Sequence, residues 1–427
     1  MTGTGSPSTA IVEAAERLVA DDESSVLRDG APLRFPATPR AERVRYAALV
    51  AGTRVAGRLR ALRGERPSLG ASGAPAAGLP ALHQTTQTVR PWDAVSNDAL
   101  AIQDLLRANG YRSELFAEHI DPSLAHRVRP IGELAAPAFA GDAVLAHVCV
   151  HAPRVYRALA AHPGGLHLRF HSNTPASWFA GVSYGFELSA RRGWEEMAAL
   201  SRRTASAIAD SAHNADEVRA VGVRDVTEVP ILLADALAPA AWTGGGGYAV
   251  SVGRIAPNKR IDFLLRTVAA YQRRFDPDFG LVLVGSDRGL ERYAAACRDL
   301  ERELGVRNVR WVGAVDEAEK QRLMAAADAY VCASDHEGFC VPLVEGFRMG
   351  LPVVARATSA VTGTCGDALA VDTADPSFLA AVLRVVVEDA ELRTRLLEVQ
   401  AREAERFDPE RVGRQVLEWA ARRVTAP

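Results

Sequence analysis

Two glutamates in the C-terminal half, Glu337 and Glu345, lie eight positions apart, between a predicted strand and a predicted helix. The apolar run 329–332 suits a buried parallel strand, and Gly338 permits a tight turn directly after Glu337. A proline four positions after Gly338 fits the first turn of the helix that carries Glu345. Free N–H groups at a helix start favour an anion. The pattern predicts a phosphate site between the two carboxylates, with Glu345 free to accept hydrogen bonds from neutral hydroxyls.

Two basic residues earlier in the chain could act on the same anion. Arg254 and Lys259 follow a predicted strand at 248–252 and are separated by a turn that contains proline and asparagine. Where negative charge develops on a phosphate during a reaction, fixed cations stabilise it in the transition state. Arginine offers a planar fork and lysine a compact charge. We therefore expect both side chains to point into a cleft above the end of this strand.

These two groups of residues resemble the signatures of one family. Glu337-Gly-Phe, followed by Pro-Leu and then Glu345, resembles the E-x7-E signature of retaining glycosyltransferase family 4, the group 1 glycosyl transferases. The Gly-Arg of Arg254 and the Pro-x-Lys of Lys259 match the second signature of that family. The resemblance covers residues 81 to 427. It implies an α/β GT-B fold, in which two Rossmann-like domains face each other across a cleft, with an N-terminal helical extension added in this chain.

The resemblance also implies an activity and roles. The activity is retaining transfer of a sugar from a nucleotide-diphosphate sugar to an acceptor hydroxyl, with no catalytic metal and no cofactor. Glu337 would contact the donor sugar, Glu345 would hold the ribose, and Arg254 and Lys259 would stabilise the leaving diphosphate. Whether Glu337 acts as a nucleophile or only positions the sugar stays open. The implied donor-binding residues are Arg254, Lys259, Gly285, Val312, Glu337, Gly338, Phe339, Cys340, Val341 and Glu345.

A histidine in the first half of the chain is the candidate for proton transfer. His171 ends a predicted strand, and the segment 170–175 is similar to the His-Asn-x-x-Pro stretch of some family members, with Ser172 inserted before Asn173. His171 could accept the proton of the acceptor hydroxyl or hydrogen-bond the donor sugar. The alternative is a structural histidine. Asn173 is expected in the acceptor part of the cleft.

The loop after the first predicted strand, 83–89, should face the same cleft. Family members often have a glycine in this loop, and here Trp92 occupies that position. Asp93 and Asn97 are candidates for binding acceptor hydroxyls. Their alternative role is helix capping, for which both residue types are suited.

The chain divides into five predicted segments. Residues 1–80 form a helical and flexible extension, and 81–233 an N-terminal Rossmann-like acceptor domain. Residues 234–247 form a linker that ends in four glycines, and 248–408 a C-terminal donor domain. Residues 409–427 are predicted to form a helix that crosses back to the first domain.

One part of the extension suggests a partner. A basic amphipathic helix is predicted to start at Pro39 and reach Arg63, with apolar residues at helical spacing between arginines. It could rest on anionic lipid or pack on the protein's own surface. The first reading predicts a peripheral membrane contact.

Composition and charge limit the classes of protein to which this chain could belong. The chain has 427 residues, 48% of them hydrophobic, which is enough for two domains, and a net charge of −2 argues against bulk nucleic-acid binding. Five scattered cysteines favour a reducing compartment. There is no signal-peptide pattern and no long apolar run, so we expect a cytoplasmic protein. The rival readings are a non-catalytic GT-B scaffold and a GT-B phosphorylase or epimerase. The donor base, the sugar and the acceptor are not determined by these patterns.

Overall fold

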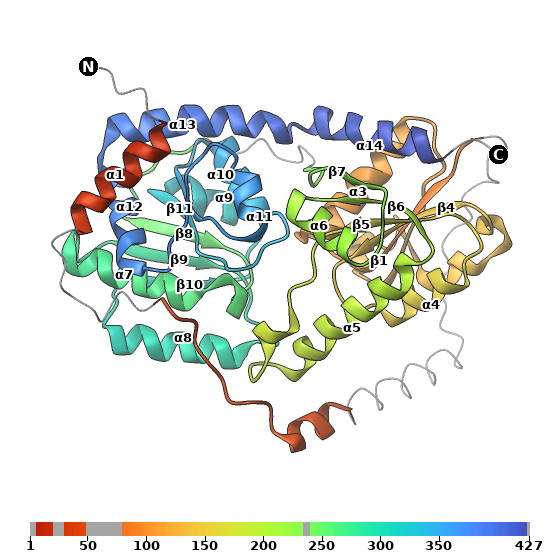
Figure 1. The fold of residues 1–427 in the computed structure, drawn as a ribbon, viewed down its shortest axis with the longest axis horizontal. Coiled ribbons are helices and arrows are strands. Elements are labelled where there is room, and N and C mark those ends of the chain that lie inside the picture. Colours follow the sequence, from red (N-terminus) through yellow and green to blue (C-terminus); the bar gives the residue numbers. More distant parts are fainter. Residues whose placement is uncertain (1–5, 20–29, 48–78, 234–239, 425–427) are drawn as a thin grey trace.

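The computed structural model describes residues 6–19, 30–47, 79–233 and 240–424. Within these ranges the chain forms two α/β domains, each built around one wholly parallel sheet (Figure 1). The alternation of strand and helix patterns predicts this architecture, because a parallel sheet needs a crossover between successive strands.

The sheet of the N-terminal domain has seven strands in the order β3-β2-β1-β4-β5-β6-β7. The chain builds outward from β1 to β3 and then returns to the other side of β1 with β4. The carboxyl ends of β1 and β4 therefore flank a topological switch point, where α/β proteins bind ligands. The strands are β1 (Leu82–Val89), β2 (Leu115–Ile120), β3 (Val128–Pro130), β4 (Ala143–Val148), β5 (Leu166–Phe170), β6 (Thr204–Ala209) and β7 (Val226–Glu228).

Four α-helices cover this sheet: α3 (Ala94–Ala108), α4 (Pro153–Ala161), α5 (Tyr184–Ser201) and α6 (Ala212–Ala220). Most core positions of the strands are apolar, as both faces of a parallel sheet are covered. Arg169 of β5 is a fully buried exception. Its guanidinium forms two hydrogen bonds with the buried carboxylate of Asp98 on α3, at 2.9 and 3.1 Å. The pairing compensates two charges that would otherwise be costly to bury.

The sheet of the C-terminal domain has six strands in the order β10-β9-β8-β11-β12-β13. Its switch point lies between β8 and β11, the two strands that precede the basic pair and Glu337. The topology thus brings these groups to one edge although some eighty residues separate them in sequence. The strands are β8 (Tyr248–Val252), β9 (Gly280–Val284), β10 (Val309–Gly313), β11 (Ala329–Cys332), β12 (Val353–Arg356) and β13 (Ala370–Val371).

The helices of this domain are α7 (Ile261–Arg274), α8 (Glu291–Leu304), α9 (Glu317–Ala326), α10 (Val341–Met349), α11 (Ser359–Cys365), α12 (Pro376–Glu388) and α13 (Ala390–Ala404). Short 3₁₀ helices occupy Pro122–Leu124, Ile131–Ala135, Pro137–Phe139, Ala176–Phe179, Pro257–Lys259 and Glu405–Phe407. In the part of the chain that the structure describes, no helix combines the length and apolar character that crossing a membrane requires.

The last helix, α14 (Pro409–Arg423), leaves the C-terminal domain and packs on the N-terminal one. Figure 1 shows α13 and α14 running along one side of both domains. Val412, Val416 and Trp419 are fully buried in one apolar cluster with Leu82 of β1 and Ile102 of α3. This is the crossing helix that the sequence predicts for residues 409–427, of which 425–427 lie outside the described residues.

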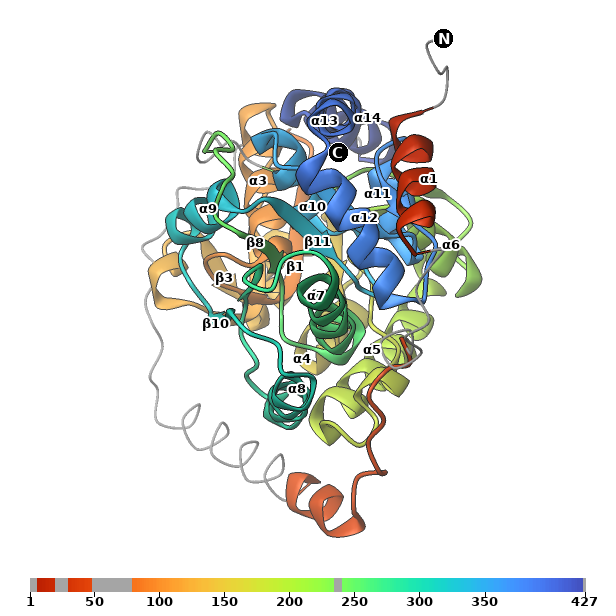
Figure 2. The same ribbon diagram turned by 90° about the vertical axis from the view of Figure 1, so that its left-hand side faces the viewer.

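The N-terminal segment is divided between the two domains. Helix α1 (Pro7–Val19) packs on α12, and Ile11 and Ala15 are fully buried in the core of the C-terminal domain (Figure 2). Further on, Phe35 contacts Tyr293 of α8, with ring centroids 6.3 Å apart. Residues 40–47 are helical, whereas the rest of the predicted basic helix, 48–63, lies outside the described residues, as do the predicted flexible stretch up to residue 78 and residues 234–239 of the linker.

Candidate active site

Two cavities lie where the domains meet. One, of about 740 Å³, contains Arg254, Lys259 and Glu337 in its wall, together with His171 and Asn173 of the other domain; we call it the Lys259 cavity. The second, of about 1130 Å³, is the Glu345 cavity. The first turn of α10 separates them, since Gly338 lines the Lys259 cavity and Val341 lines the other. The two glutamates of the signature therefore face different compartments on either side of one helix start.

Lys259 and Glu337 are joined directly. The Lys259 ammonium lies 2.6 Å from Oε1 and 2.5 Å from Oε2 of Glu337. Ser334 donates a further hydrogen bond to Oε1, at 2.6 Å. Burial alone would lower the pKa of Lys259, but the adjacent carboxylate outweighs it and raises that pKa above its ordinary value. Lys259 is therefore fully charged at neutral pH, and Glu337 is held in one orientation at the cavity wall.

Arg254 is the cation at the mouth of the same cavity. Its side chain is exposed and its guanidinium lies over the ring of Phe186, 5.1 Å from the centroid. Within the described ranges it forms no ion pair with a carboxylate. Glu337 pairs with Lys259, and Asp93 pairs with Arg90 in the same wall. Because Arg254 contacts no carboxylate among the described residues, the cavity carries a positive charge that suits an anionic ligand.

The start of α10 explains where two other predicted donor-binding residues lie. Phe339 is buried and packs edge-on against Phe407, with centroids 5.3 Å apart. Cys340 precedes the helix with φ 76°, and its thiol lies 3.6 Å from the hydroxyl of Tyr330 in the core. Both side chains therefore point away from the cavities. Their contribution to a ligand is limited to the backbone N–H groups at the helix start, which favour an anion.

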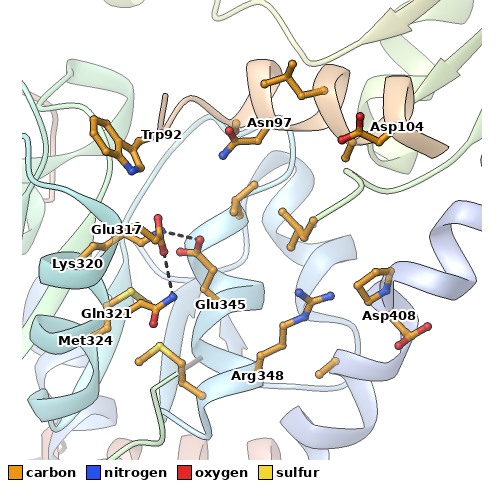
Figure 3. Close-up of a pocket in the computed structure, with 18 of the residues that line it drawn as sticks. Trp92, Asn97, Asp104, Glu317, Lys320, Gln321, Met324, Glu345, Arg348 and Asp408 are labelled. Atoms are coloured by element: carbon orange, nitrogen blue, oxygen red, sulfur yellow. Dashed lines mark hydrogen bonds and ion pairs between the residues drawn. The ribbon is translucent and has the colours of Figure 1, made fainter. Parts of the chain in front are cut away.

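Glu345 lies in the second cavity with a basic partner that the sequence analysis missed. The Lys320 ammonium is 2.7 Å from Oε1 of Glu345 and 2.9 Å from Oε1 of Glu317 (Figure 3). Burial raises the pKa of Glu345, and Lys320 only partly offsets that effect. Lys320 lies on α9, where it is one of several charged residues, so its spacing gave no signal.

His171 is locked in a chain of hydrogen bonds. Gln84 donates its amide to the carbonyl of Ala99, which turns its oxygen toward Nε2 of His147, 2.8 Å away. His147 is neutral, because burial and the neighbouring His171 lower its pKa well below the ordinary value. Nδ1 of His147 therefore accepts from Nε2 of His171 at 2.8 Å, and Nδ1 of His171 donates to Asp210 at 2.8 Å.

These hydrogen bonds limit the roles that His171 can have. Both of its ring nitrogens are occupied by protein partners, and its side chain is only 2% exposed. In this arrangement neither nitrogen is available to take a proton from an acceptor. The histidine that the sequence singles out thus lies at the cavity wall, hydrogen-bonded to His147 and Asp210, which favours a structural or positioning role over the proton-accepting one.

The remaining cleft residues fall into two groups. Asp93 caps α3, accepting from the backbone N–H of Ser96 at 3.1 Å, and also lines the Lys259 cavity. Asn97 lines the Glu345 cavity (Figure 3). Asn173 is buried and donates its amide to the carbonyl of Ala190 at 2.8 Å, which fixes α5. The position of Asp93 is therefore explained by helix capping, and the position of Asn173 by its hydrogen bond to α5.

Gly285 and Val312, expected near the nucleotide base, line neither cavity. Gly285 has φ 151°, and a Cβ there would lie 1.8 Å from the carbonyl oxygen of Gly253. The glycine is required by the close approach of two strand ends. Val312 packs against the second apolar cluster of the C-terminal domain.

Left-handed backbone conformations concentrate around the cleft. Trp92, Ser172, Cys340 and Ser359 all have φ between 42° and 76°. Such conformations cost about 1–3 kcal/mol each in residues with a Cβ and are retained where the surrounding structure enforces them. Ser359 accepts a hydrogen bond from the backbone N–H of Glu337 at 2.8 Å. Contacts of this kind hold the loops that present the cavity residues in their left-handed conformations.

One further wall residue comes from outside the two domains. Tyr46, on the N-terminal segment, lines the Lys259 cavity and packs edge-on against Tyr184, with centroids 5.7 Å apart. No motif marks it in the sequence, because an isolated tyrosine in a basic helix carries no spacing signal.

Comparisons with known proteins define the class and then the family. The Anabaena protein HepE, solved in complex with UDP-glucose, superposes with a TM-score of 0.61 at 19% identity, over 80% of this chain and all of that one. This likeness confirms the predicted GT-B fold. A model of the family described as "Glycosyl transferases group 1" matches residues 234–402.

Two curated relatives support the same family. The phosphatidyl-myo-inositol mannosyltransferase of Mycobacterium leprae is 30% identical over 61% of this chain and 68% of its own length. The D-inositol 3-phosphate glycosyltransferase of Nocardioides is 35% identical over 39% of each chain. The matches to the first three relatives span only 35–42% of their lengths. This chain belongs to the group 1 glycosyl transferases, as the sequence predicts; its place in family 4 within that group stays a prediction.

Proposed function

We propose that this protein transfers a sugar from a nucleotide-diphosphate sugar to an acceptor hydroxyl with retention of configuration and without a catalytic metal. The observation that carries the proposal is the Lys259–Glu337 pair in a cavity that also contains Arg254, at the switch point of the C-terminal sheet. Three charged groups predicted from two separate motifs meet there, and the fourth, Glu345, lines the neighbouring cavity.

The leaving group determines what the cations do. As the bond between the anomeric carbon and the phosphate oxygen breaks, its electron pair passes to the diphosphate. Arg254, Lys259 and the N–H groups at the start of α10 lie where that charge develops, and preorganised donors of this kind lower the barrier. A divalent cation would do the same work, which is why the basic pair supports metal independence.

Retention requires that the acceptor bond forms on the face that the leaving group vacates. We infer that the acceptor proton passes to the departing phosphate oxygen, because His171 has no free nitrogen in this arrangement. Glu337 is engaged through both oxygens by Lys259 and through one by Ser334. A carboxylate so strongly hydrogen-bonded is a weak nucleophile, which supports a role in positioning the donor sugar.

Glu345 would accept hydrogen bonds from the ribose hydroxyls in the second cavity. Lys320 favours the charged form of the carboxylate there, since it partly offsets the rise in pKa that burial causes. The nucleoside and the sugar would then lie on opposite sides of the first turn of α10, with the diphosphate at the helix start between them.

The names of the relatives suggest the chemical class of the substrates. They include glycosyl- and mannosyltransferases whose names contain D-inositol 3-phosphate, phosphatidyl-myo-inositol and cellobiosyl-diphosphopolyprenol. We propose a hexose donor and a polyol, saccharide or lipid-linked acceptor. A peripheral contact of the basic segment from Pro39 to Arg63 with the inner face of the membrane, for an enzyme in the cytoplasm, would suit a lipid-linked acceptor.

The test is thermal unfolding of the purified protein with UDP, GDP, dTDP, ADP and CDP, with and without magnesium. A ligand that binds only the folded state raises the Tm in proportion to the logarithm of its saturation. One diphosphate should raise the Tm without metal, and the rise should disappear in the Lys259→Ala variant. If no diphosphate raises the Tm of the wild-type protein under either condition, the cavities do not bind a nucleotide. The protein is then better explained as a non-catalytic GT-B scaffold.

A further inference from the structure

A group of three side chains that could bind a metal lies across the domain junction, beside the proposed transfer site, and one of them, His336, also lines the Lys259 cavity. His213 and Glu217 stand one turn apart on α6 of the N-terminal domain, and His336 comes from the loop between β11 and α10 of the other domain. One possible ligand atom from each residue lies within 4.8 Å of the other two. The two imidazole rings meet edge-on, with centroids 5.9 Å apart. Figure 1 shows α6 beside α11 at this junction.

The ligand atoms are buried without hydrogen-bond partners. Nε2 of His213, Nε2 of His336 and Oε2 of Glu217 are each shielded from solvent and unsatisfied. His336 as a residue is only 7% exposed. A buried polar atom with no partner destabilises a protein, and three that converge on one point are rare unless a further group binds between them. The nearest contact within the cluster, from Nε2 of His213 to Oε1 of Glu217, is 3.7 Å, too long for a hydrogen bond.

Two comparable clusters within the described ranges are satisfied internally. In the group of Asp98, His147 and His171, the carboxylate is paired with Arg169, and both histidines are hydrogen-bonded. In the group of Cys332, Glu337 and Cys340, the ammonium of Lys259 binds the carboxylate. These two groups have no need of an ion, in contrast to the three orphaned atoms at the junction.

The ligand types identify the class of ion. Two imidazole nitrogens and one carboxylate form the protein-ligand set of zinc sites that keep an open fourth position, and histidines suit Zn²⁺, Co²⁺ and Ni²⁺. Ca²⁺ and Mg²⁺ prefer oxygen ligands only. Ligands at zinc distances would stand roughly 3.3–3.6 Å apart in a tetrahedron. Since no two of these ligand atoms are more than 4.8 Å apart, the cluster must contract by at most about 1.5 Å, which side-chain rotations on α6 can supply because His213 is partly exposed.

We propose that His213, Glu217 and His336 bind one Zn²⁺ or a similar transition-metal ion, which clasps the two domains together. The ligands come from both sides of the junction, and neighbouring residues already make contact there: the Ser211 hydroxyl donates to the carbonyl oxygen of Gly338 at 2.8 Å. His336 directly precedes Glu337, so the ion would also fix the loop that presents this carboxylate. The site does not depend on the proposed sugar transfer.

The experiment uses the full-length protein without a polyhistidine tag, stripped with EDTA and then freed of chelator. We expect calorimetry to give one zinc ion per chain, Co²⁺ to give the visible absorption of a tetrahedral nitrogen–oxygen site, and zinc to raise the Tm. Mg²⁺ should do none of these. His213→Ala, Glu217→Ala and His336→Ala should each weaken zinc binding by at least roughly 100-fold, more than loss of a second-shell partner usually costs.

The matched control is His126→Ala, since His126 is an exposed histidine outside the cluster. It should bind zinc like the wild type. Circular dichroism and the Tm in EDTA show whether each variant folds. If an alanine variant does not fold, the conservative variant Glu217→Gln is measured in its place. Zinc binding that is equally tight in all variants, or none in the wild type at millimolar zinc, overturns the site.

Discussion

Glu337 depends on Lys259 as the cation that compensates its buried carboxylate. Replacing Lys259 by alanine removes a transition-state cation and leaves the mostly buried Glu337 with only Ser334 as a side-chain partner. We expect kcat/KM for transfer to fall by about 10²–10³, the usual effect of losing one preorganised donor. Steady-state kinetics with the donor found by the nucleotide panel measure this.

The control for this substitution is Lys320→Ala, which removes a lysine from the other cavity. It should affect nucleoside affinity, seen in KM, far more than kcat, because the ribose does not change charge during transfer. An unchanged kcat/KM in the Lys259→Ala protein would remove Lys259 from the chemistry.

Glu345 provides a second test at the same scale. Glu345→Gln keeps the shape of the side chain but removes the charge that pairs with Lys320 and the strong acceptor for ribose hydroxyls. KM for the donor should rise by about tenfold or more while kcat changes little, since a charge-assisted hydrogen bond contributes about 1.5–3 kcal/mol. A fall in kcat at unchanged KM would instead place Glu345 at the reacting bond.

The candidate site was predictable where its chemistry follows from local spacing. Glu337, Glu345, Arg254 and Lys259 lie in short motifs after strands, and parallel topology brings strand ends to one edge. The burial of His171 was not predictable, because its partners His147 and Asp210 come from two other strands or strand ends, and no local pattern encodes their contact. The inward direction of Phe339 and Cys340 likewise depends on the core beneath α10.

At the scale of elements, α1 is a structural part of the C-terminal domain. Ile11 is fully buried against α12. Ile11→Ala should destabilise the protein by about 2–4 kcal/mol, the cost of a large-to-small change in a core, whereas Glu13→Ala on the exposed side should change stability little. Denaturant unfolding measures both. Equal stability of the two variants would mean that the extension is dispensable.

The segment 30–47 contributes a side chain to the wall of the Lys259 cavity. Tyr46 lines the Lys259 cavity on the side of the N-terminal domain, where the acceptor is expected. Tyr46→Ala should raise KM for the acceptor several-fold, because an aromatic ring offers a sugar or polyol a flat apolar surface, and should leave the Tm rise with nucleotide unchanged. Tyr46→Phe, which keeps the ring, should behave like the wild type. A lost nucleotide response would instead mean that the segment supports the donor site.

The strands of the sheets were predicted unevenly, for physical reasons. The runs 248–252 and 329–332 coincide with β8 and β11, because central strands of a parallel sheet are covered on both faces and are therefore mostly apolar. The short strands β3, β7 and β13 were not predicted. They have two or three residues each, lie at sheet edges, and owe their pairing to the neighbouring strand more than to their own composition.

At the scale of the whole molecule, α14 fastens the C-terminal domain to the sheet of the N-terminal one. Trp419 of α14 packs edge-on against His167 of β5, with centroids 5.2 Å apart, and His167 also hydrogen-bonds Ser206 at 2.9 Å. Burial, helped by the positive charge of Arg423, lowers the pKa of His167 to about 4. The ring is therefore neutral in the folded protein across the physiological range.

This pKa makes the stability of the junction depend on pH. The unfolded chain binds a proton at His167 near the ordinary value of about 6.5, while the folded protein does so only near 4. The free energy of unfolding should therefore fall as the pH drops below about 6.5 and reach its lower limit below about 4. From these two values, His167 alone should account for a loss of about 2 kcal/mol between about pH 7 and about pH 5. In His167→Phe that part of the slope should vanish, whatever its stability at neutral pH. Denaturant unfolding at both pH values measures the slope, and the same pH dependence in both proteins would show that the proton is taken up elsewhere.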